Sequence, residues 1–364
     1  MAENRLRVLV VDDTVVYRKI VKDLLSELPE VEVVGAAHNG RVALSRIAEL
    51  KPDLLTLDIE MPEMNGLEVL EEIRRQGLAV GAIMLSTLTR KGGEMTMQAL
   101  SLGAFDFVPK PQEATIELNM EAVRKALFPM IEAYRRQREL KKVISPGLAR
   151  PLAAKPPSAA PAAGVRRASG QKSEIVAIGI STGGPNALAR LLPMLPSDLG
   201  VPVLIVQHMP ALFTQSLATS LNAKTALNVR EAVEGEPLVS NTVLIAPGGR
   251  QMKIAAGADG RSRVIRLTDD PPENSCRPSV DYLFRSVADH YVGRATAVIM
   301  TGMGNDGTKG LGLLKKAGAI TIAQSAETCV VYGMPKEAIE SGAVDIVAPL
   351  DELAEQIRRT VRLV

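Results

Sequence analysis

The sequence has no tryptophan, only five phenylalanines and only two cysteines. Two cysteines cannot build a disulfide scaffold, and Cys276 and Cys329 lack the spacing of a zinc-binding motif. No stretch approaches the ~18 consecutive apolar residues of a membrane-spanning helix, and the N-terminal MAENRLR has no apolar signal-peptide core. We therefore expect a soluble protein of the reducing cytoplasm that does not insert into membranes.

The length of 364 residues exceeds what one hydrophobic core usually serves, which favours two domains. The net charge is only +2, but residues 116–172 hold 12 Lys and Arg against 4 Asp and Glu. A basic stretch can indicate nucleic-acid binding, yet no zinc finger or aromatic-rich sheet motif accompanies this one. We interpret it as a solvated linker and expect no nucleic-acid partner.

The first third of the chain alternates apolar runs with amphipathic stretches, which is typical of a parallel α/β fold. The helix-like segments include Val16–Leu28 and Arg41–Leu50. We predict a doubly wound, five-stranded parallel domain of the flavodoxin-like kind over residues 1–120. Its expected strands are 7–13, 31–37, 53–58, 82–86 and 105–111.

A linker is predicted over residues 121–172. The segment 117–142 has a helical pattern, and Pro129 predicts a break or kink in it. The stretch that follows is rich in proline and alanine and nearly free of large apolar residues, which is typical of a flexible tether.

A second α/β domain is predicted over residues 173–364, doubly wound and mostly parallel. Ala246–Leu267 indicates a hairpin rather than a crossover. The expected strands are 174–181, 201–208, 242–248, 295–302, 319–324 and 343–349, and helices are expected to begin at Pro185, Phe213, Val280, Gly310 and Pro335.

Polar side chains stand at the carboxyl ends of four of the five strands of the first domain: Asp12 and Asp13, Asp58, Ser86 and Lys110. In open parallel sheets, ligands bind at this edge. An aspartate after a strand is commonly a turn or cap residue, but the full set is harder to explain in that way. Three carboxylates in one crevice suit Mg²⁺, which could hold a phosphoryl group beside Asp58.

The motifs VVDD, LDIEMPEMNG, Ser86-Thr87 and Lys110-Pro111 resemble a bacterial response-regulator receiver domain, over residues 5 to about 120. The resemblance implies that Asp58 is the phosphoacceptor of a histidine kinase. It implies that Asp12, Asp13 and Asp58 hold Mg²⁺ with a backbone carbonyl near Glu60. Lys110 would contact the phosphoryl group, and the Ser86 hydroxyl would follow it as the switch.

Ser181 follows an apolar strand and enters the turn TGGP, which leads into a helix. Residues 179–183 satisfy the G-x-S-x-G pattern of a nucleophile elbow, although glycine-flanked serines are common in such turns. The turn could instead bind a nucleotide, but the full spaced glycine fingerprint is missing. A nucleotide- or flavin-binding module therefore stays as a structural rival.

The order of the partners separates two triads. The α/β-hydrolase order would use Ser181, then Asp269 or Asp270, then His290, in poor loop and helix contexts. The order Ser181, His208, Asp306 puts all three at the ends of predicted strands, where the loops converge. A tight turn or helix cap at Asp306 would leave Ser181 and His208 without an orienting acid. We favour the second order, with Met303 N–H as a candidate oxyanion donor.

The motifs GISTGGP, QHMP, NSCRPSVDYLF, TGMGNDG and CVVYGMPKEA resemble the catalytic domain of chemotaxis receptor methylesterases, over most of residues 174–360. The resemblance implies the triad Ser181, His208 and Asp306, with Thr182 beside the nucleophile and no cofactor for the esterase. It implies hydrolysis of γ-glutamyl methyl esters on methylated chemoreceptors to glutamate and methanol, and deamidation of receptor glutamines.

Two further alternatives concern the surroundings of this site. Arg277 could steer acidic receptor segments, or pair with a structural carboxylate such as Asp281. Cys276 and Cys329 are interpreted as small buried or half-buried residues, and a Cys276 nucleophile is discounted. The second domain is too large and too near neutral for the output of a DNA-binding response regulator. From the tether, we hypothesise that the unphosphorylated receiver blocks the triad by docking.

Overall fold

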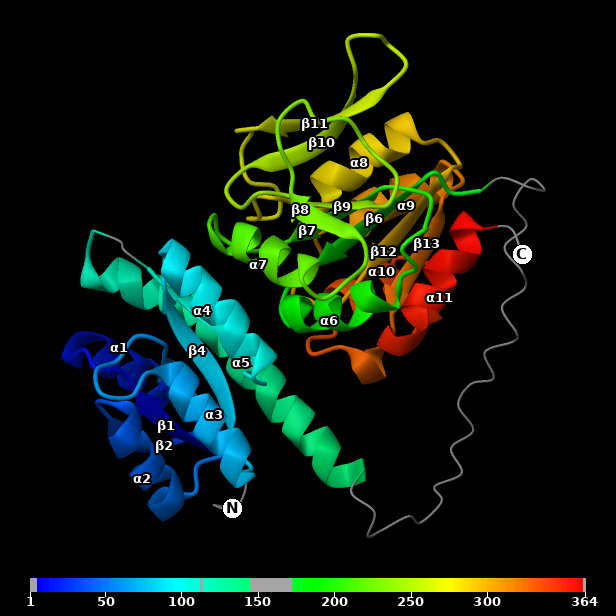
Figure 1. Cartoon of the computed structure of the whole chain (residues 1–364). Coiled ribbons are helices and arrows are strands. Elements are labelled where there is room, and N and C mark those ends of the chain that lie inside the picture. Colours follow the sequence, from blue (N-terminus) through cyan, green and yellow to red (C-terminus); the bar gives the residue numbers. More distant parts are fainter. Residues whose placement is uncertain (1–4, 112–113, 145–171, 363–364) are drawn as a thin grey trace. The chain divides into compact units, whose positions relative to one another are not determined.

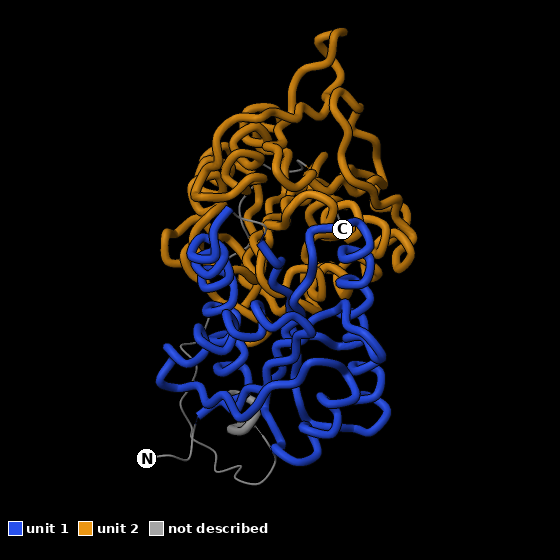
Figure 2. Tube along the Cα trace, turned by 90° about the vertical axis from the view of Figure 1, so that its left-hand side faces the viewer, with its two compact units in different colours: residues 1–138 blue, residues 139–364 orange. Residues whose placement is uncertain are grey.

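The computed structural model describes residues 5–111, 114–144 and 172–362. The chain forms two compact units, residues 1–138 and 139–364 (Figure 2). Each unit is built on a parallel sheet, which confirms the predicted fold class. In the described part of the chain, no helix is long and apolar enough to cross a membrane.

The first unit contains a five-stranded sheet in the order β2-β1-β3-β4-β5, with all neighbouring strands parallel (Figure 1). This order is that of flavodoxin-like folds. All five predicted strands are confirmed to within two residues at their ends. The elements are β1 (Leu6–Val11), α1 (Val15–Ser26), β2 (Val31–Ala37), α2 (Gly40–Leu50), β3 (Leu54–Asp58), α3 (Gly66–Gln76), β4 (Gly81–Thr87), α4 (Arg90–Ser101), β5 (Asp106–Lys110) and α5 (Ile116–Ile144).

Helix α5 belongs to the first unit up to Arg138, and it runs through Pro129 without ending. Of the predicted break or kink at Pro129, the break is therefore wrong, and the kink stays a prediction. Val123 and Leu127 before the proline and Ile131 after it are all buried in the core of the five-stranded unit. This packing holds the helix together although proline removes one hydrogen bond, and it carries the unit beyond residue 120, to Arg138. The predicted tether lies mostly outside the described residues.

The second unit contains a seven-stranded parallel sheet in the order β14-β13-β12-β6-β7-β9-β8. The six predicted strands and the five predicted helix starts are confirmed to within three residues. The elements are β6 (Ile175–Ile180), α6 (Gly184–Leu191), η1 (Leu192–Met194), β7 (Val203–Gln207), α7 (Phe213–Asn222), β8 (Asn228–Glu231), β9 (Thr242–Ile245), β10 (Gln251–Ala256), β11 (Arg263–Thr268), α8 (Val280–His290), β12 (Ala295–Ile299), α9 (Thr308–Lys316), β13 (Ile320–Gln324), η2 (Ala326–Thr328), α10 (Met334–Glu340), β14 (Ile346–Ala348) and α11 (Leu350–Val361).

Helices cover both faces of this sheet, and β10 and β11 form the predicted antiparallel hairpin (Figure 1). Ala295 and Ala297 of β12 lie in one core with residues of α8 and α9. Thr296, between them, points to the other face, where its hydroxyl bonds Thr360 of α11. The fold is therefore doubly wound. The loops after the central strands β12, β6 and β7 lie together at the carboxyl ends of these strands.

Candidate functional site

The acidic site of the first unit lies where β1, β3 and β5 end. Asp58 is the last residue of β3 and Lys110 is the last residue of β5. The Lys110 Nζ atom lies 2.7 Å from Asp58 Oδ2 and 2.8 Å from Asp12 Oδ2. All three side chains are buried. The structure therefore brings together the predicted phosphoacceptor, lysine and first acid.

Burial is the main influence on Asp58 and disfavours its charge. The charge of Lys110 acts to lower the pKa of Asp58, and the charge of Asp12 acts to raise it. The net result of burial and these charges is a pKa raised to about 6. Apart from the lysine, Asp58 receives one long hydrogen bond, 3.4 Å from the N–H of Glu60 to Oδ1. Its carboxylate is therefore held loosely by fixed donors, and its oxygens remain open to a new bond.

The acids at this edge fit a hard divalent cation. Oxygens of Asp12, Asp13 and Asp58 lie within 4.8 Å of one another, and Asp13 is exposed to solvent. Three carboxylates against one lysine leave an excess of two negative charges. Oxygen ligands and this charge suit Mg²⁺.

The hydroxyl of Ser86 is turned into helix α4 and away from bulk solvent. Ser86 Oγ donates to the carbonyl of Gly92 over 3.2 Å and accepts a 2.8 Å hydrogen bond from Thr96 Oγ1. Both hydroxyl side chains are fully buried. Thr96 was not predicted from the sequence, because only the packing of α4 on β4 brings it to Ser86.

The residues of the second candidate site follow three neighbouring strands. Ser181 follows β6, His208 follows β7, and Asp306 lies in the loop after β12. Backbone hydrogen bonds tie the strand ends together, from Ser181 N–H to the Thr301 carbonyl (2.9 Å) and from His208 N–H to the Ile180 carbonyl (3.2 Å). The predicted convergence at one sheet edge is thus present in the fold.

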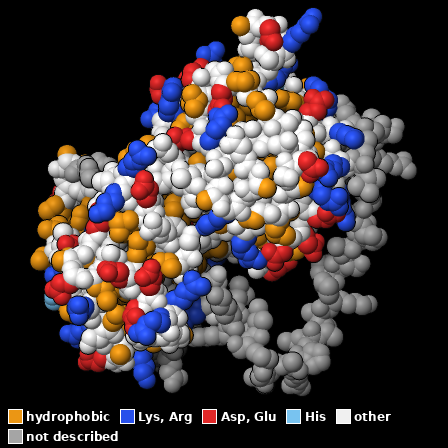
Figure 3. Space-filling model, in the orientation of Figure 1, with side chains coloured by type: hydrophobic (Ala, Val, Ile, Leu, Met, Phe, Trp, Pro, Cys, Tyr) orange, Lys and Arg blue, Asp and Glu red, His pale blue; other side chains and the backbone are white. Residues whose placement is uncertain are grey.

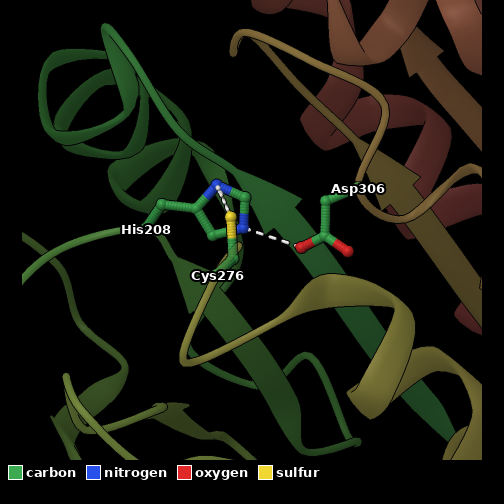
Figure 4. Close-up of side chains that lie close together, drawn as sticks. All are labelled: His208, Cys276 and Asp306. Carbon is green, nitrogen blue, oxygen red and sulfur yellow. Dashed lines mark hydrogen bonds and ion pairs between the residues drawn. The ribbon is translucent and has the colours of Figure 1, made fainter. Parts of the chain in front are cut away.

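His208 and Asp306 are in direct contact, as Figure 4 shows. His208 Nε2 lies 2.8 Å from Asp306 Oδ2, and the other ring nitrogen, Nδ1, lies 3.7 Å from the sulfur of Cys276. Burial opposes protonation of the ring, but the hydrogen bonds with Asp306 and Cys276 outweigh it and raise the pKa of His208 to about 9. No hydrogen bond from Ser181 Oγ to the ring occurs among the described residues.

The carboxylate of Asp306 is surrounded by donors from the start of α8. Its Oδ1 accepts from Asn274 Nδ2 (2.8 Å) and Ser279 Oγ (2.8 Å), and its Oδ2 accepts from the N–H of Val280 (2.7 Å). Burial acts to raise its pKa, but these donors and His208 prevail and lower the pKa of Asp306 to about 2. This acid is fixed in place and stays charged at neutral pH.

Asn274 and Ser279 were given no individual role from the sequence, although both lie in the motif NSCRPSVDYLF. Asn274 donates to Asp281 Oδ2 (2.9 Å) as well as to Asp306, so one amide joins two buried acids. The signal available was the Ser279 N-cap of α8, since a helix N-terminus provides free N–H groups for an acid. That the acid would come from a distant loop depends on tertiary packing.

Thr182 and Met303 lie on the two backbone segments that meet at Ser181. Within the described residues, neither the N–H of Thr182 nor that of Met303 donates a hydrogen bond. Thr301 Oγ1 donates to the Thr182 carbonyl over 2.9 Å, which holds the turn against the loop after β12. A Cβ on Gly302 would lie 2.7 Å from the Cβ of Ser181, so only glycine allows this approach.

The side chains of Asp270 and Arg277 have partners other than the triad residues. Asp270 accepts a hydrogen bond from Tyr282, and Asp306 is the acid that holds a histidine. Arg277 does not pair with Asp281, because the Asp281 carboxylate faces inward and accepts from Asn274 and from Gly310 N–H. The Arg277 guanidinium instead donates to the Asp269 carbonyl over 3.3 Å.

On the face shown in Figure 3, basic and acidic side chains are interspersed over both units. Cys276 and Cys329 are half-buried, as predicted.

Comparison with known proteins settles the family. The family described as "CheB methylesterase" matches residues 176–357, and the family described as "Response regulator receiver domain" matches residues 8–120. A protein-glutamate methylesterase/protein-glutamine glutaminase of Desulfotalea psychrophila is 55% identical over 99% of this chain and 100% of its own. The chain belongs to this family of receiver-linked methylesterases.

Further relatives agree. The protein-glutamate methylesterase/protein-glutamine glutaminase of Bacillus subtilis is 41% identical over 98% of this chain and 99% of its own. The crystal structure of the CheB methylesterase catalytic domain of Thermotoga maritima is 41% identical, covers 51% of this chain and 98% of its own, and superposes with a TM-score of 0.50. The second unit is thus a methylesterase domain, and the predictions of the family and of an enzyme are confirmed.

Proposed function

We propose that this protein removes methyl groups from γ-glutamyl methyl esters of methylated chemoreceptors and deamidates receptor glutamines, with Ser181, His208 and Asp306 as the triad. The observation that carries the proposal is the 2.8 Å pair of His208 and Asp306 at the sheet edge where Ser181 ends the neighbouring strand. Since Asp306 engages Nε2, Nδ1 is the nitrogen left to accept the proton of Ser181.

The chemistry follows from these positions. Ser181 Oγ attacks the ester carbonyl while His208 takes its proton, and the charge on the ring is stabilised by Asp306. The N–H groups of Met303 and Thr182 would donate hydrogen bonds to the oxyanion. The protonated ring then donates to the leaving methoxide, so that methanol departs, and water releases glutamate by the same steps. With a glutamine side chain, ammonia leaves in place of methanol.

Control by the first unit is the second part of the proposal. Asp58 accepts a phosphoryl group from a chemotaxis histidine kinase or a small phosphodonor. Asp12, Asp13 and Asp58 would hold Mg²⁺, which neutralises charge at the phosphoryl group when bound. Lys110 contacts the phosphoryl oxygens, and the Ser86 hydroxyl exchanges its bonds to α4 for them. The unphosphorylated unit would restrain the esterase by docking over the triad, and phosphorylation would release it.

The test measures methanol released from a methylated receptor fragment, with and without Mg²⁺ and a small phosphodonor. The unmodified protein, Ser181→Ala and Asp58→Asn are compared. We expect stimulation by the phosphodonor in the first, no turnover in the second, and unstimulated turnover in the third. Turnover by Ser181→Ala would overturn the nucleophile, and stimulation of Asp58→Asn would overturn the phosphoacceptor.

A further inference from the structure

The thiol of Cys276 lies against the base and has no part in the serine chemistry. Its sulfur is 3.7 Å from His208 Nδ1, although the two residues are 68 positions apart in the sequence. Two backbone hydrogen bonds between Glu273 and Cys276 (3.1 and 2.8 Å) fix the loop that carries it. The sulfur and the ring nitrogen therefore face each other in a defined way (Figure 4).

The separation of these two atoms fits a tetrahedral metal ion. Zinc binds a histidine nitrogen at about 2.0–2.1 Å and a cysteine sulfur at about 2.3 Å, which puts tetrahedral N and S ligands about 3.6 Å apart. The observed separation of 3.7 Å is close to this value.

The other side of the ring has the arrangement of a metal-binding histidine. Asp306 Oδ2 holds Nε2 at 2.8 Å, which leaves the lone pair on Nδ1. A carboxylate on the far nitrogen is the usual support of a zinc-bound imidazole. Asp306 itself is an orienting group here and not a ligand, because hydrogen bonds from Asn274, Ser279 and Val280 already occupy its oxygens.

The donor set also selects the kind of ion. A thiolate and an imidazole favour zinc over magnesium, which prefers oxygen ligands. The cluster His208, Cys276 and Asp306 thus differs in chemistry from the oxygen-only cluster of Asp12, Asp13 and Asp58. Cys276 and His208 are both partly exposed, so an ion has a route from solvent.

We propose that His208 Nδ1 and Cys276 Sγ form an inhibitory binding site for zinc. One Zn–N and one Zn–S bond form, the thiol proton and any proton on Nδ1 go to solvent, and water fills the other positions on the ion. The ion takes the lone pair that would accept the proton of Ser181, so the esterase stops until the metal is removed. The binding rests on this geometry alone, whereas the inhibition rests on the proposed function.

The experiment uses the full chain, with Co²⁺ as a spectroscopic probe and Zn²⁺ as the inhibitor. Cys276→Ser removes the sulfur, and Cys329→Ser is the matched control, since the other thiol lies 3.8 Å from a carbonyl and away from the base. We expect a cobalt–thiolate charge-transfer band in the unmodified protein and in Cys329→Ser, and none in Cys276→Ser. Half-maximal inhibition by Zn²⁺ should need at least about tenfold more metal in Cys276→Ser.

A third measurement needs no variant. Zn²⁺ should slow alkylation of Cys276 in the unmodified protein, followed by mass spectrometry. A band that persists in Cys276→Ser, no band in the unmodified protein, or equal zinc inhibition of all three proteins would overturn the proposal. A thiolate band in a chain that releases no methanol would support the site and count against the proposed function, so the two failures are distinguishable.

Discussion

Each unit has an aspartate at the carboxyl edge of its parallel sheet, and the surroundings shift the pKa values of the two aspartates in opposite directions. Asp306 receives hydrogen bonds from Asn274, Ser279 and backbone N–H groups, and its pKa is lowered to about 2. Asp58 has Lys110 and one long backbone bond, and burial raises its pKa to about 6. A carboxylate whose oxygens are fully hydrogen-bonded can orient a partner. A carboxylate with few hydrogen bonds can still form a new bond.

Replacing Asp306 with asparagine should have the largest effect on the esterase activity. The amide keeps the shape but cannot stabilise a charged ring, so kcat should fall by about 10⁴-fold. Methanol release in single-turnover assays checks this. Phosphorylation of Asp58 serves as the control and should be unaffected, since that site lies in the other unit. A loss of less than tenfold would remove Asp306 from the triad.

The pH dependence of the esterase tests how strongly Asp306 acts on the base. His208 must be neutral to accept a proton, and its pKa is raised to about 9, so kcat/KM should increase with pH through the neutral range and level off near pH 9. The increase from pH 7 should exceed about tenfold. The groups facing the ring are Asp306 and Cys276.

The same pH profile also tests the effect of Asp306 on the ring of His208. Asp306→Asn removes a hydrogen bond and a charge that raise the pKa of His208, so its residual activity should level off at a lower pH than that of the unmodified protein. A flat profile between pH 7 and pH 9 in the unmodified enzyme would contradict the role of His208 as the base.

Asn274→Ala tests the comparison further by removing one of the hydrogen-bond donors to Asp306. A hydrogen bond to a charged group contributes about 1.5–3 kcal/mol, so kcat should fall about tenfold or more, with KM little changed. Asn222→Ala is the matched control, because the Asn222 side chain accepts from Val229 N–H near the start of β8. Equal loss in both variants would indicate a general effect on the fold.

Thr96→Val should produce the smallest effect, in the first unit. The valine cannot donate to Ser86 Oγ, so this hydroxyl is freer to move toward the phosphoryl group. Stimulation by the phosphodonor should be half-maximal at about a threefold lower concentration. In the control Thr87→Val, the lost hydroxyl contacts Glu60 and does not touch Ser86. An unchanged or higher requirement in Thr96→Val would contradict the restraint by α4.

Sequence patterns were sufficient for what depends on strands and their ends. The apolar runs located the sheets, and the position after each run placed Asp58, His208 and Asp306. Helix α11 was also within reach, since Leu350, Leu353, Ile357 and Val361 repeat at helical spacing on its buried face. The strand β8 was not, because Asn228–Glu231 has no apolar run and owes its state to pairing with β9.

What the sequence could not supply is contact between segments that lie far apart in the chain. Asn274 reaches Asp306 from 32 residues away, and Cys276 reaches His208 from 68. Pro129 predicts a break by local rules, yet burial of Leu127 and Ile131 overrides it. Each case is decided by packing energy that no local pattern contains.

The central position of β12, β6 and β7 in the seven-stranded sheet affects how this enzyme loses structure. The edge strands β14 and β8 have one neighbour each. We therefore expect them to open first and the middle pairs to open only with the whole domain. The amides of Ile178 and Ile205 should thus be among the last to exchange with deuterium. Active-site geometry would then persist through local fraying and disappear only in global unfolding.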